Sequence, residues 1–390
     1  MGRRVAVTGL GVVANCGIGK EAFWSGLLSG PPAHGFDVDG FDPEPYYDNP
    51  KETRRSDKFT QFALAAAHEA LEQAGDLSAD PARIGCWVGT GVGGIETLEA
   101  QIETFLEKGP RRVSPFLVPM MMANAATASI SMKYGFQGPC ENTVTACAAG
   151  THSIGRAADL IKYGRCDVVV AGGSEAARSP VAKQGFINMT AISSAGISRP
   201  FDRERDGFMH SEAAGILVLE EWGMAEARGA TIIAEVLGSG STADAHHITA
   251  PSPGGSGAVR CMELAMDDAG IAAADVAHIN AHGTSTPLND AAEAEAVSKV
   301  FGPNGPPITS TKGVTGHALG AAGAIEAVAA VLTMQHELIP PTFGFETQDP
   351  EIAEINLVVG GPKAWTPGPT LSNSFGFGGH NGTLVLGTGA

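Results

Sequence analysis

One cysteine and two histidines in this chain each lie where an apolar segment gives way to a segment of small residues. Cys147 lies in NTVTACAAGTHSIG, between the β-branched run 143–145 and a segment with helical spacing. His282 lies in NAHGTSTPLND, and His317 lies in STKGVTGHALGAAG. Sites in α/β sheets assemble at strand ends, so we expect these three side chains to meet.

Together the three residues predict acyl chemistry. A thiol in the first turn of a helix is expected to ionise more easily than a free thiol, because unpaired N–H groups and the helix dipole favour negative charge. A thiolate attacks acyl groups, and two imidazoles that donate Nε–H can hold a thioester carbonyl as it gains enolate charge. We expect Lys312 to supply a fixed positive charge that biases the tautomer of His317. The GFGG segment at 376–379 offers a backbone N–H for an oxyanion hole. Taken alone, Cys147 also fits a buried structural cysteine.

Composition limits the partners and the compartment. The chain has 390 residues and a formal net charge of −17, which argues against nucleic acid as a general partner because phosphate binding needs a basic surface. Its six cysteines show neither CxxC pairs nor zinc-ligand spacing, so we expect a reducing, cytoplasmic setting. The longest apolar segment, 327–334, is too short to span a bilayer, and we expect no membrane partner.

Strand and helix patterns alternate in both halves of the sequence. Expected strands include 4–10, 84–94, 355–359 and 383–387, and the run 143–145 before Cys147. Expected helices include 57–75, 255–269, 288–300 and 319–336. This alternation predicts α/β layers with mainly parallel sheets, and the two halves fit a duplication in pattern but not in residue identity.

Four motifs in this order resemble one known family: TACAAG, HGTSTP, STKGVTGHALGAAG and NSFGFGG. They are similar to those of the β-ketoacyl-acyl carrier protein synthases of the elongating type II, or Cys-His-His, group. The resemblance implies a thiolase-like α/β fold with two duplicated αβ halves that form a five-layered α-β-α-β-α core. It also implies a half at 1–230 carrying the cysteine, a half at 231–390 carrying both histidines, and a homodimer.

The implied reaction is decarboxylative Claisen condensation of malonyl-acyl carrier protein with a cysteine-bound acyl chain. By position, Cys147 resembles the acyl-accepting nucleophile, and His282 and His317 resemble the pair that promotes decarboxylation. Lys312 resembles the lysine that supports His317, and Phe377 resembles the gate whose N–H completes the oxyanion hole with that of Cys147. The resemblance also implies a set of substrate-binding residues: Phe186, Thr249, Thr284, Thr286, Asn289, Phe375 and His380.

The same resemblance bears on ions and partners. No cofactor is expected for the chemistry. The family often has a buried structural monovalent cation, at positions that correspond to Asn280, Glu326, Ser372 and Asn381; an internal hydrogen-bond network is the alternative at these four. The basic residues that dock acyl carrier protein correspond to Lys51, Arg54 and Arg55.

Three departures from the family pattern add bulk near active-site loops. His380 stands where threonine is usual, Asn289 where glycine is common, and Ser211-Glu212-Ala213 where glycine flanks an acid on both sides. They lead to the hypothesis of a specialised or inhibitor-tolerant elongating synthase of a natural-product pathway, with a role in antibiotic resistance. Ordinary fatty-acid elongation is the alternative.

Rival functions follow from the same motifs. A ketosynthase of a type II polyketide pathway differs only in substrate and stays open. A non-catalytic partner resembling a chain-length factor lacks the nucleophile that is present here. A degradative thiolase needs a second catalytic cysteine near the C-terminus, where NSFGFGGHNG has none.

Overall fold

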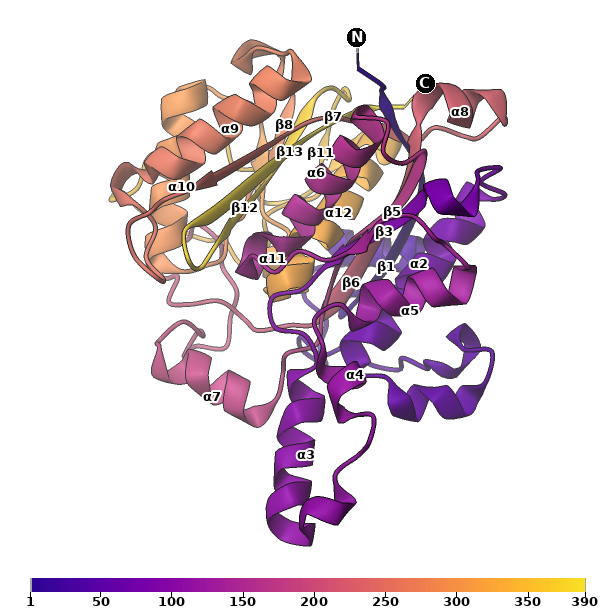
Figure 1. Cartoon of the computed structure of the whole chain (residues 1–390). Coiled ribbons are helices and arrows are strands. Elements are labelled where there is room, and N and C mark those ends of the chain that lie inside the picture. The colour runs from indigo at the N-terminus through magenta and orange to yellow at the C-terminus, as the bar shows by residue number, and fades with distance from the viewer. Residues whose placement is uncertain (1, 390) are drawn as a thin grey trace.

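Apolar runs from both halves of the chain build one continuous hydrogen-bonded sheet in the computed structural model, which describes residues 2–389 (Figure 1). The N-terminal half contributes strands in the order β4 (Cys140–Glu141), β3 (Ile84–Gly89), β5 (Val168–Glu175), β6 (Ala213–Glu221) and β1 (Val5–Ala14), with β2 (Gly17–Ile18) paired to β1. The C-terminal half continues with β7 (Ala234–Ala243), β13 (His380–Thr388), β12 (Thr370–Gly376), β8 (His278–Asn280) and β9 (Ile308–Thr309).

The two halves repeat one strand pattern. β3 pairs in parallel with β4 and β5, and β8 pairs in parallel with β9 and β12. In each half an antiparallel pairing follows, β5 with β6 and β12 with β13. The halves join where β1 meets β7 through two residue pairs, Ala6↔Glu235 and Val7↔Ala234. The duplication expected from the alternating pattern is therefore present in the topology.

Helices complete the five layers (Figure 1). α6 (Ala149–Lys162) and α12 (Ala322–His336) pack against each other between the two half-sheets. α2 (Lys58–Ala74) and α5 (Ala125–Tyr134) cover the outer face of the first half-sheet, and α9 (Ser256–Ala269) and α10 (Pro287–Phe301) lie outside the second. Small residues let α6 and α12 pack closely in the central layer, since a Cβ at Gly150 would lie only 2.7 Å from the backbone N of Ala324. The α/β class and five-layered core predicted above are confirmed, but the prediction of mainly parallel sheets was wrong. Most strand pairings of the large sheet are antiparallel, because β1, β6, β7 and β13 all pair antiparallel to their neighbours where the two halves join.

The two central helices begin alike. Each follows a single 3-10 turn, η5 (Ala146–Ala148) before α6 and η8 (Leu319–Ala321) before α12. The first residue of each turn has a left-handed backbone, with φ of 50° at Ala146 and 44° at Leu319. Such a conformation is costly for a residue with a side chain and persists where packing enforces it. The duplicated fold thus brings Cys147 and the segment after His317 to equivalent sharp turns.

The remaining elements surround this core. The other helices are α1 (Lys20–Ser29), α3 (Ile95–Lys108), α4 (Leu117–Met121), α7 (Pro180–Asn188), α8 (Trp222–Ala227) and α11 (Lys312–Thr315). Short strands β10 (Leu338–Ile339) and β11 (Lys363–Ala364) pair with each other. The other 3-10 turns are η1 (Glu44–Tyr46), η2 (Pro50–Arg55), η3 (Pro81–Arg83), η4 (Pro110–Arg112), η6 (Pro253–Gly255) and η7 (Ala273–Asp275). Within residues 2–389, no helix has the length and apolar character that crossing a membrane requires.

Two strand predictions were wrong. Residues 355–359 lie beside the edge strand β9 and form only an isolated bridge there, Ile308↔Leu357. The run 143–145 belongs to no strand; β4 ends at Glu141, and Val144 is half exposed. The helix predictions were better: α2 lies within 57–75 and begins after Asp57, whose carboxylate accepts the N–H of Phe59 at 3.2 Å.

Candidate active site

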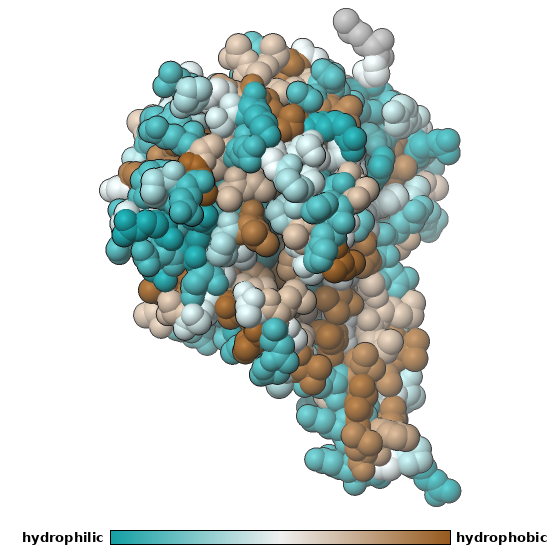
Figure 2. Space-filling model, turned by 90° about the vertical axis from the view of Figure 1, so that its left-hand side faces the viewer, coloured by the Kyte–Doolittle hydropathy of each residue, from teal (hydrophilic) through white to brown (hydrophobic). Residues whose placement is uncertain are grey.

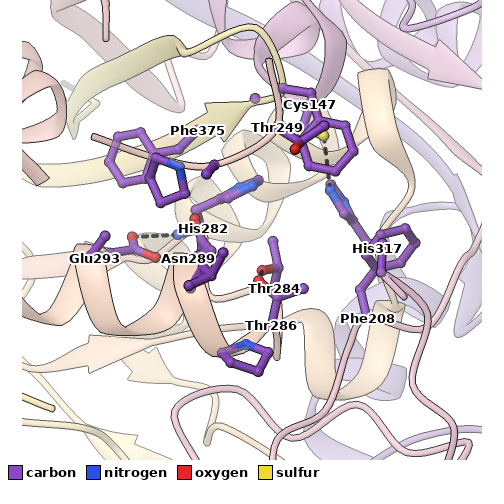
Figure 3. Close-up of a pocket in the computed structure, with 18 of the residues that line it drawn as sticks. Cys147, Phe208, Thr249, His282, Thr284, Thr286, Asn289, Glu293, His317 and Phe375 are labelled. Atoms are coloured by element: carbon purple, nitrogen blue, oxygen red, sulfur yellow. Dashed lines mark hydrogen bonds between the residues drawn. The ribbon is translucent and has the colours of Figure 1, made fainter. Parts of the chain in front are cut away.

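Cys147, His282 and His317 meet at one point (Figure 3). The cysteine Sγ and one ring nitrogen from each histidine all lie within 4.8 Å of one another. His317 Nε2 is 3.1 Å from Cys147 Sγ. Three different segments supply the residues: the η5 turn, the loop after β8, and the loop between α11 and η8. The meeting predicted from the three strand ends is therefore observed.

The three residues lie at the inner end of a cavity of about 520 Å³. Phe186 and Phe208 give one side an apolar character, and their rings meet edge to face with centroids 5.5 Å apart. Another part of the lining is polar and includes Thr249, Thr284, Thr286 and Asn289. Figure 3 shows Thr284, Thr286 and Asn289 near His282, with Phe208 next to His317. The shape suits a substrate with an apolar chain and a polar arm.

The expectation of an easily ionised thiol was wrong. Burial raises the pKa of Cys147 to about 11, because the thiolate loses water solvation. The charge of Lys312 and the backbone N–H groups of Phe377 and of Cys147 itself act in the opposite direction and do not overcome burial. The thiol therefore stays protonated at neutral pH. It becomes a nucleophile only when a nearby base takes its proton.

Both histidines are held neutral. Each ring is at most 2% exposed, and burial lowers the pKa of His282 and His317 well below the usual range. The positive charge of Lys312 lowers both pKa values further. The two rings meet edge to face, with centroids 5.3 Å apart. A neutral imidazole has one N–H and one bare nitrogen, so the tautomer decides whether a ring donates or accepts a proton at the cavity.

Lys312 contacts His282 and not His317, the neighbour predicted from the sequence. Its ammonium group donates to the backbone carbonyl of His282 at 2.6 Å and to His282 Nδ1 at 3.3 Å. It also forms a buried ion pair with Glu326 on α12. The cause is topological: α11 begins at the end of β9, directly beside the end of β8 that carries His282. Lys312 therefore sets the tautomer of His282, leaving the proton on Nε2.

Two buried carboxylates that sequence analysis missed hold the loops of the site. Glu293 on α10 accepts the backbone N–H groups of His282 at 2.8 Å and Gly283 at 2.7 Å. Glu175, at the end of β5, accepts those of Gly91 at 2.5 Å and Gly320 at 3.1 Å. Burial raises the pKa of both carboxyl groups to about 7. Nothing in the helical pattern around Glu293 distinguishes it from a surface glutamate.

The C-terminal motif lies beside the thiol, with one exception. Gly376 and Phe377 line the cavity, and a Cβ on Gly376 would lie 3.1 Å from the backbone N of Cys147. Phe375 also lines it, 5.9 Å from the ring of His282. His380, predicted to bind substrate, does not line the cavity although Gly379 and Asn381 do. Successive residues at the start of β13 face opposite sides, so His380 faces away.

The four residues proposed for a cation form separate contacts. Asn280 donates to Ser372 Oγ at 3.3 Å. Glu326 pairs with Lys312, and its second carboxylate oxygen is buried without a partner among residues 2–389. Asn381 donates to Asp244 Oδ1, directly after β7, at 2.8 Å and to Thr242 Oγ1 on β7 at 3.3 Å. The pairing of Glu326 with an ammonium group and the turn of Asn381 toward β7 fit a hydrogen-bond network better than one cation site.

The predicted docking residues are at the surface. Lys51, Arg54 and Arg55 lie on η2 and are exposed. The guanidinium of Arg55 lies over the ring of Phe116, 4.5 Å from its centroid. This contact holds η2 against the segment that follows η4, where Arg111 and Arg112 are also exposed.

Comparison with known proteins agrees with this geometry. The model of the beta-ketoacyl synthase N-terminal domain matches residues 32–225, and that of the C-terminal domain matches residues 233–346. The chain is 43% identical to a 3-oxoacyl-acyl-carrier-protein synthase 2 of Staphylococcus aureus, covering 98% of each chain. A beta-ketoacyl synthase from Burkholderia phymatum superimposes with a TM-score of 0.92 at 33% identity, covering 99% of each chain. A type II polyketide ketosynthase, solved with its acyl-carrier protein, superimposes with a TM-score of 0.89 at 32% identity over the full length of both.

The raised pKa of Cys147 predicts slow alkylation at neutral pH. The rate of iodoacetamide modification at this residue should rise about tenfold for each pH unit from 7 to 10, because only the thiolate reacts. Mass spectrometry of the Cys147 peptide measures the rate separately from those of the other five cysteines. The Cys147→Ala variant, which lacks this thiol, shows which mass-spectrometric signal belongs to alkylated Cys147. A rate that levels off by pH 8 would contradict the effect of burial described here.

The Lys312–Glu326 pair predicts a stability effect that depends on pH. Lys312→Met should lower the free energy of unfolding by about 3–5 kcal/mol at pH 8, because it leaves a buried carboxylate without its partner. The loss should be smaller at pH 5.5, where the orphaned carboxyl group takes up a proton. Urea unfolding measures both values. The double variant Lys312→Met/Glu326→Gln should recover part of the loss, and equal stability of the single and double variants would refute the coupling.

Proposed function

This chain belongs to the β-ketoacyl synthase family, and we propose that it condenses malonyl-acyl carrier protein with an acyl chain held on Cys147, as in fatty-acid elongation. It is an acyl-transferring condensing enzyme. The observation that carries the proposal is the contact of one thiol with two neutral imidazoles at the end of a cavity with an apolar and a polar side. The proposed steps use side chains and backbone groups of this chain alone.

The first step transfers the acyl group. His317 Nε2 takes the thiol proton as Cys147 Sγ attacks the thioester carbonyl. The backbone N–H groups of Cys147 and Phe377, which both point to the sulfur, stabilise the oxyanion. The oxyanion collapses, the carbon–sulfur bond to the carrier breaks, and the carrier thiol leaves with the proton from His317. This step needs no thiolate beforehand, which agrees with the raised pKa of Cys147.

The second step forms the carbon–carbon bond. The malonyl carboxylate leaves as CO₂, and its bonding electrons pass to the thioester carbonyl, which becomes an enolate held by N–H groups of His282 and His317. The enolate carbon attacks the acyl carbonyl on Cys147. Collapse of that oxyanion releases the β-ketoacyl product and the Cys147 thiolate. The thiolate takes up one proton, so each turnover consumes one proton.

The two histidines suit different tasks in this scheme. Lys312 fixes the proton of His282 on Nε2, so this ring is always a donor toward the cavity. His317 Nδ1 is buried with no hydrogen-bond partner among residues 2–389, so no neighbour fixes its tautomer. His317 Nε2 can therefore accept the thiol proton in the first step and donate N–H in the second.

A polyketide substrate is the second candidate. The observation that favours it is the close superposition on a ketosynthase whose solved complex includes a bound hexaketide and its acyl-carrier protein. The polar side of the cavity has hydroxyl groups at Thr249, Thr284 and Thr286. The relatives named as 3-oxoacyl synthases favour the fatty-acid reaction. The products of the reaction therefore distinguish a polyketide substrate from a fatty-acyl substrate.

We propose acyl carrier protein as the docking partner on the basic surface of η2, which Lys51, Arg54 and Arg55 form. Carrier proteins of this kind present acidic surfaces, and the net charge of −17 on this chain makes a local basic cluster necessary for their approach.

A homodimer is part of the proposal, because β4 is an exposed edge strand beside the exposed apolar residues Met132 and Val144. Figure 2 shows further apolar side chains along the projecting lower part of the molecule. The six cysteines are free, which fits the proposed cytoplasmic location.

Asn289 supports the proposal of altered inhibitor tolerance and provides its test. Its side chain lines the cavity and donates to Asp290 at 3.1 Å, so it narrows the polar end where malonyl binds in this scheme. Asn289→Gly should make inhibitors that occupy this end bind more tightly, lowering their inhibition constants about tenfold. His380→Thr is the matched control, because His380 faces away from the cavity. Inhibition constants of Asn289→Gly equal to those of the wild-type enzyme would contradict the proposal that Asn289 alters inhibitor tolerance.

The function is tested by supplying acyl thioesters of carrier protein with malonyl carrier protein and identifying the products by mass. The wild-type enzyme should lengthen the acyl chain by two carbons and release CO₂. Cys147→Ala should abolish acylation and condensation. His282→Ala should leave acylation of Cys147 intact but lower condensation by about 10²–10³, the usual effect of removing one oxyanion donor. Condensation by Cys147→Ala at the wild-type rate would overturn the proposal.

A further inference from the structure

His210 lies directly behind the active site, and the mechanism above does not use it. Its side chain is 4% exposed. The backbone around it binds that of His317: the N–H of His317 donates to Met209 O at 2.7 Å, and the N–H of Ser211 donates to His317 O at 3.1 Å. Its position is therefore fixed relative to the reacting groups.

The imidazole of His210 has no hydrogen-bond partner. Both ring nitrogens are buried and unpaired among residues 2–389. Burial and the nearby charges of Arg178 and Lys183 lower its pKa to about 4, with Asp37 acting weakly in the opposite direction, so the ring is neutral. A neutral imidazole has one donor and one acceptor, and leaving buried polar groups unpaired costs about 1–3 kcal/mol each. A polar ligand group would remove this cost.

The neighbours of His210 belong to the apolar side of the cavity. Its ring meets that of Phe186 edge to face with centroids 5.3 Å apart, and that of Phe208 at 6.2 Å. Both phenylalanines line the cavity, whereas His210 does not, so they separate its ring from the space beside Cys147. An acyl chain on Cys147 that extends along this side reaches these two rings first.

Phe186 is the part of this wall that is easiest to displace. It lies on α7, a helix of nine residues with no buried residue. Figure 1 shows α7 hanging at the lower left, away from the layered core. A helix with few buried apolar contacts moves at low cost in free energy. A small shift of α7 would carry Phe186 aside and open the cavity to His210.

We infer that His210 is a specificity-determining residue at the far end of the acyl pocket and that it selects acyl chains with a hydroxyl or carbonyl oxygen remote from the thioester. The inference rests on the proposed condensation and names its substrate class. An oxygen at this depth pairs with the unpaired ring nitrogens. A saturated chain of equal length leaves them buried against methylene groups, which is unfavourable.

The test compares acyl chains of equal length, with and without a terminal hydroxyl group, over a series of lengths on carrier protein. For the wild-type enzyme, kcat/KM should favour the hydroxylated chain about tenfold at the matching length, the effect of one or two hydrogen bonds. His210→Leu should abolish this preference by improving use of the saturated chain. His210→Gln, which retains a donor and an acceptor, should keep part of it.

His278→Leu is the matched control. His278 is also a buried histidine with both ring nitrogens unpaired, but it packs against Trp365 and lies outside the cavity. Both leucine variants remove an unpaired buried imidazole, so each should unfold at or above the wild-type temperature. Only His210→Leu should change the preference between chains.

Intact mass of acylated Cys147 measures the same preference without condensation. Equal use of the two chains at every length by the wild-type enzyme, or an unchanged preference in His210→Leu, would overturn the role of His210. Selective acylation of Cys147 without any condensed product would leave that role in place and refute the proposed function.

Discussion

The contact between a protonated thiol and a neutral imidazole is the interaction on which the site depends. Cys147 Sγ and His317 Nε2 are 3.1 Å apart, and both groups are almost fully buried. Burial disfavours charge on each of them, raising the pKa of the thiol and lowering that of the ring. The pair therefore rests without an internal charge separation, and in the proposed first step the proton moves as the substrate carbonyl takes up negative charge.

Such a site needs rigid support, because its groups come from loops far apart in the chain. Buried carboxylates provide this support by accepting loop N–H groups: Glu293 holds the loop of His282, and Glu175 joins the turn after β3 to Gly320. The Lys312–Glu326 pair links α12 to the backbone of His282. These anchors explain why acidic residues are buried around chemistry in which they take no direct part.

The duplicated core makes this arrangement possible. The turns before α6 and α12 correspond, and their small residues let the two helices approach closely between the half-sheets. One turn carries the nucleophile, and the loop before the other carries His317. Where the halves meet, the cavity gains an apolar side from Phe186 and Phe208 and a polar side from the loop after β8.

Local sequence determined much of this protein. The apolar periodicity of α2, the small-residue helices after Cys147 and His317, and the motifs themselves indicated the α/β class, the duplication and the three reacting residues. These features depend on near neighbours in the chain, and local patterns record them. The segment 355–359 has the pattern of a strand, but it forms only one bridge to the short edge strand β9, because pairing length depends on the neighbouring strand and not on the local pattern.

The tertiary structure alone decided the charges and partners. The residues next to Cys147 in the sequence do not show that burial raises the pKa of its thiol more than the helix start lowers it. The atoms that exclude water from the thiol come from distant segments. The partner of Lys312 proved to be His282, because the order of the strands places β9 beside β8. His380 proved to face away from the cavity, because successive side chains of β13 point to opposite faces of the sheet. Glu293 and His210 look ordinary in sequence, and only packing across elements shows one bound to a loop and the other without a partner.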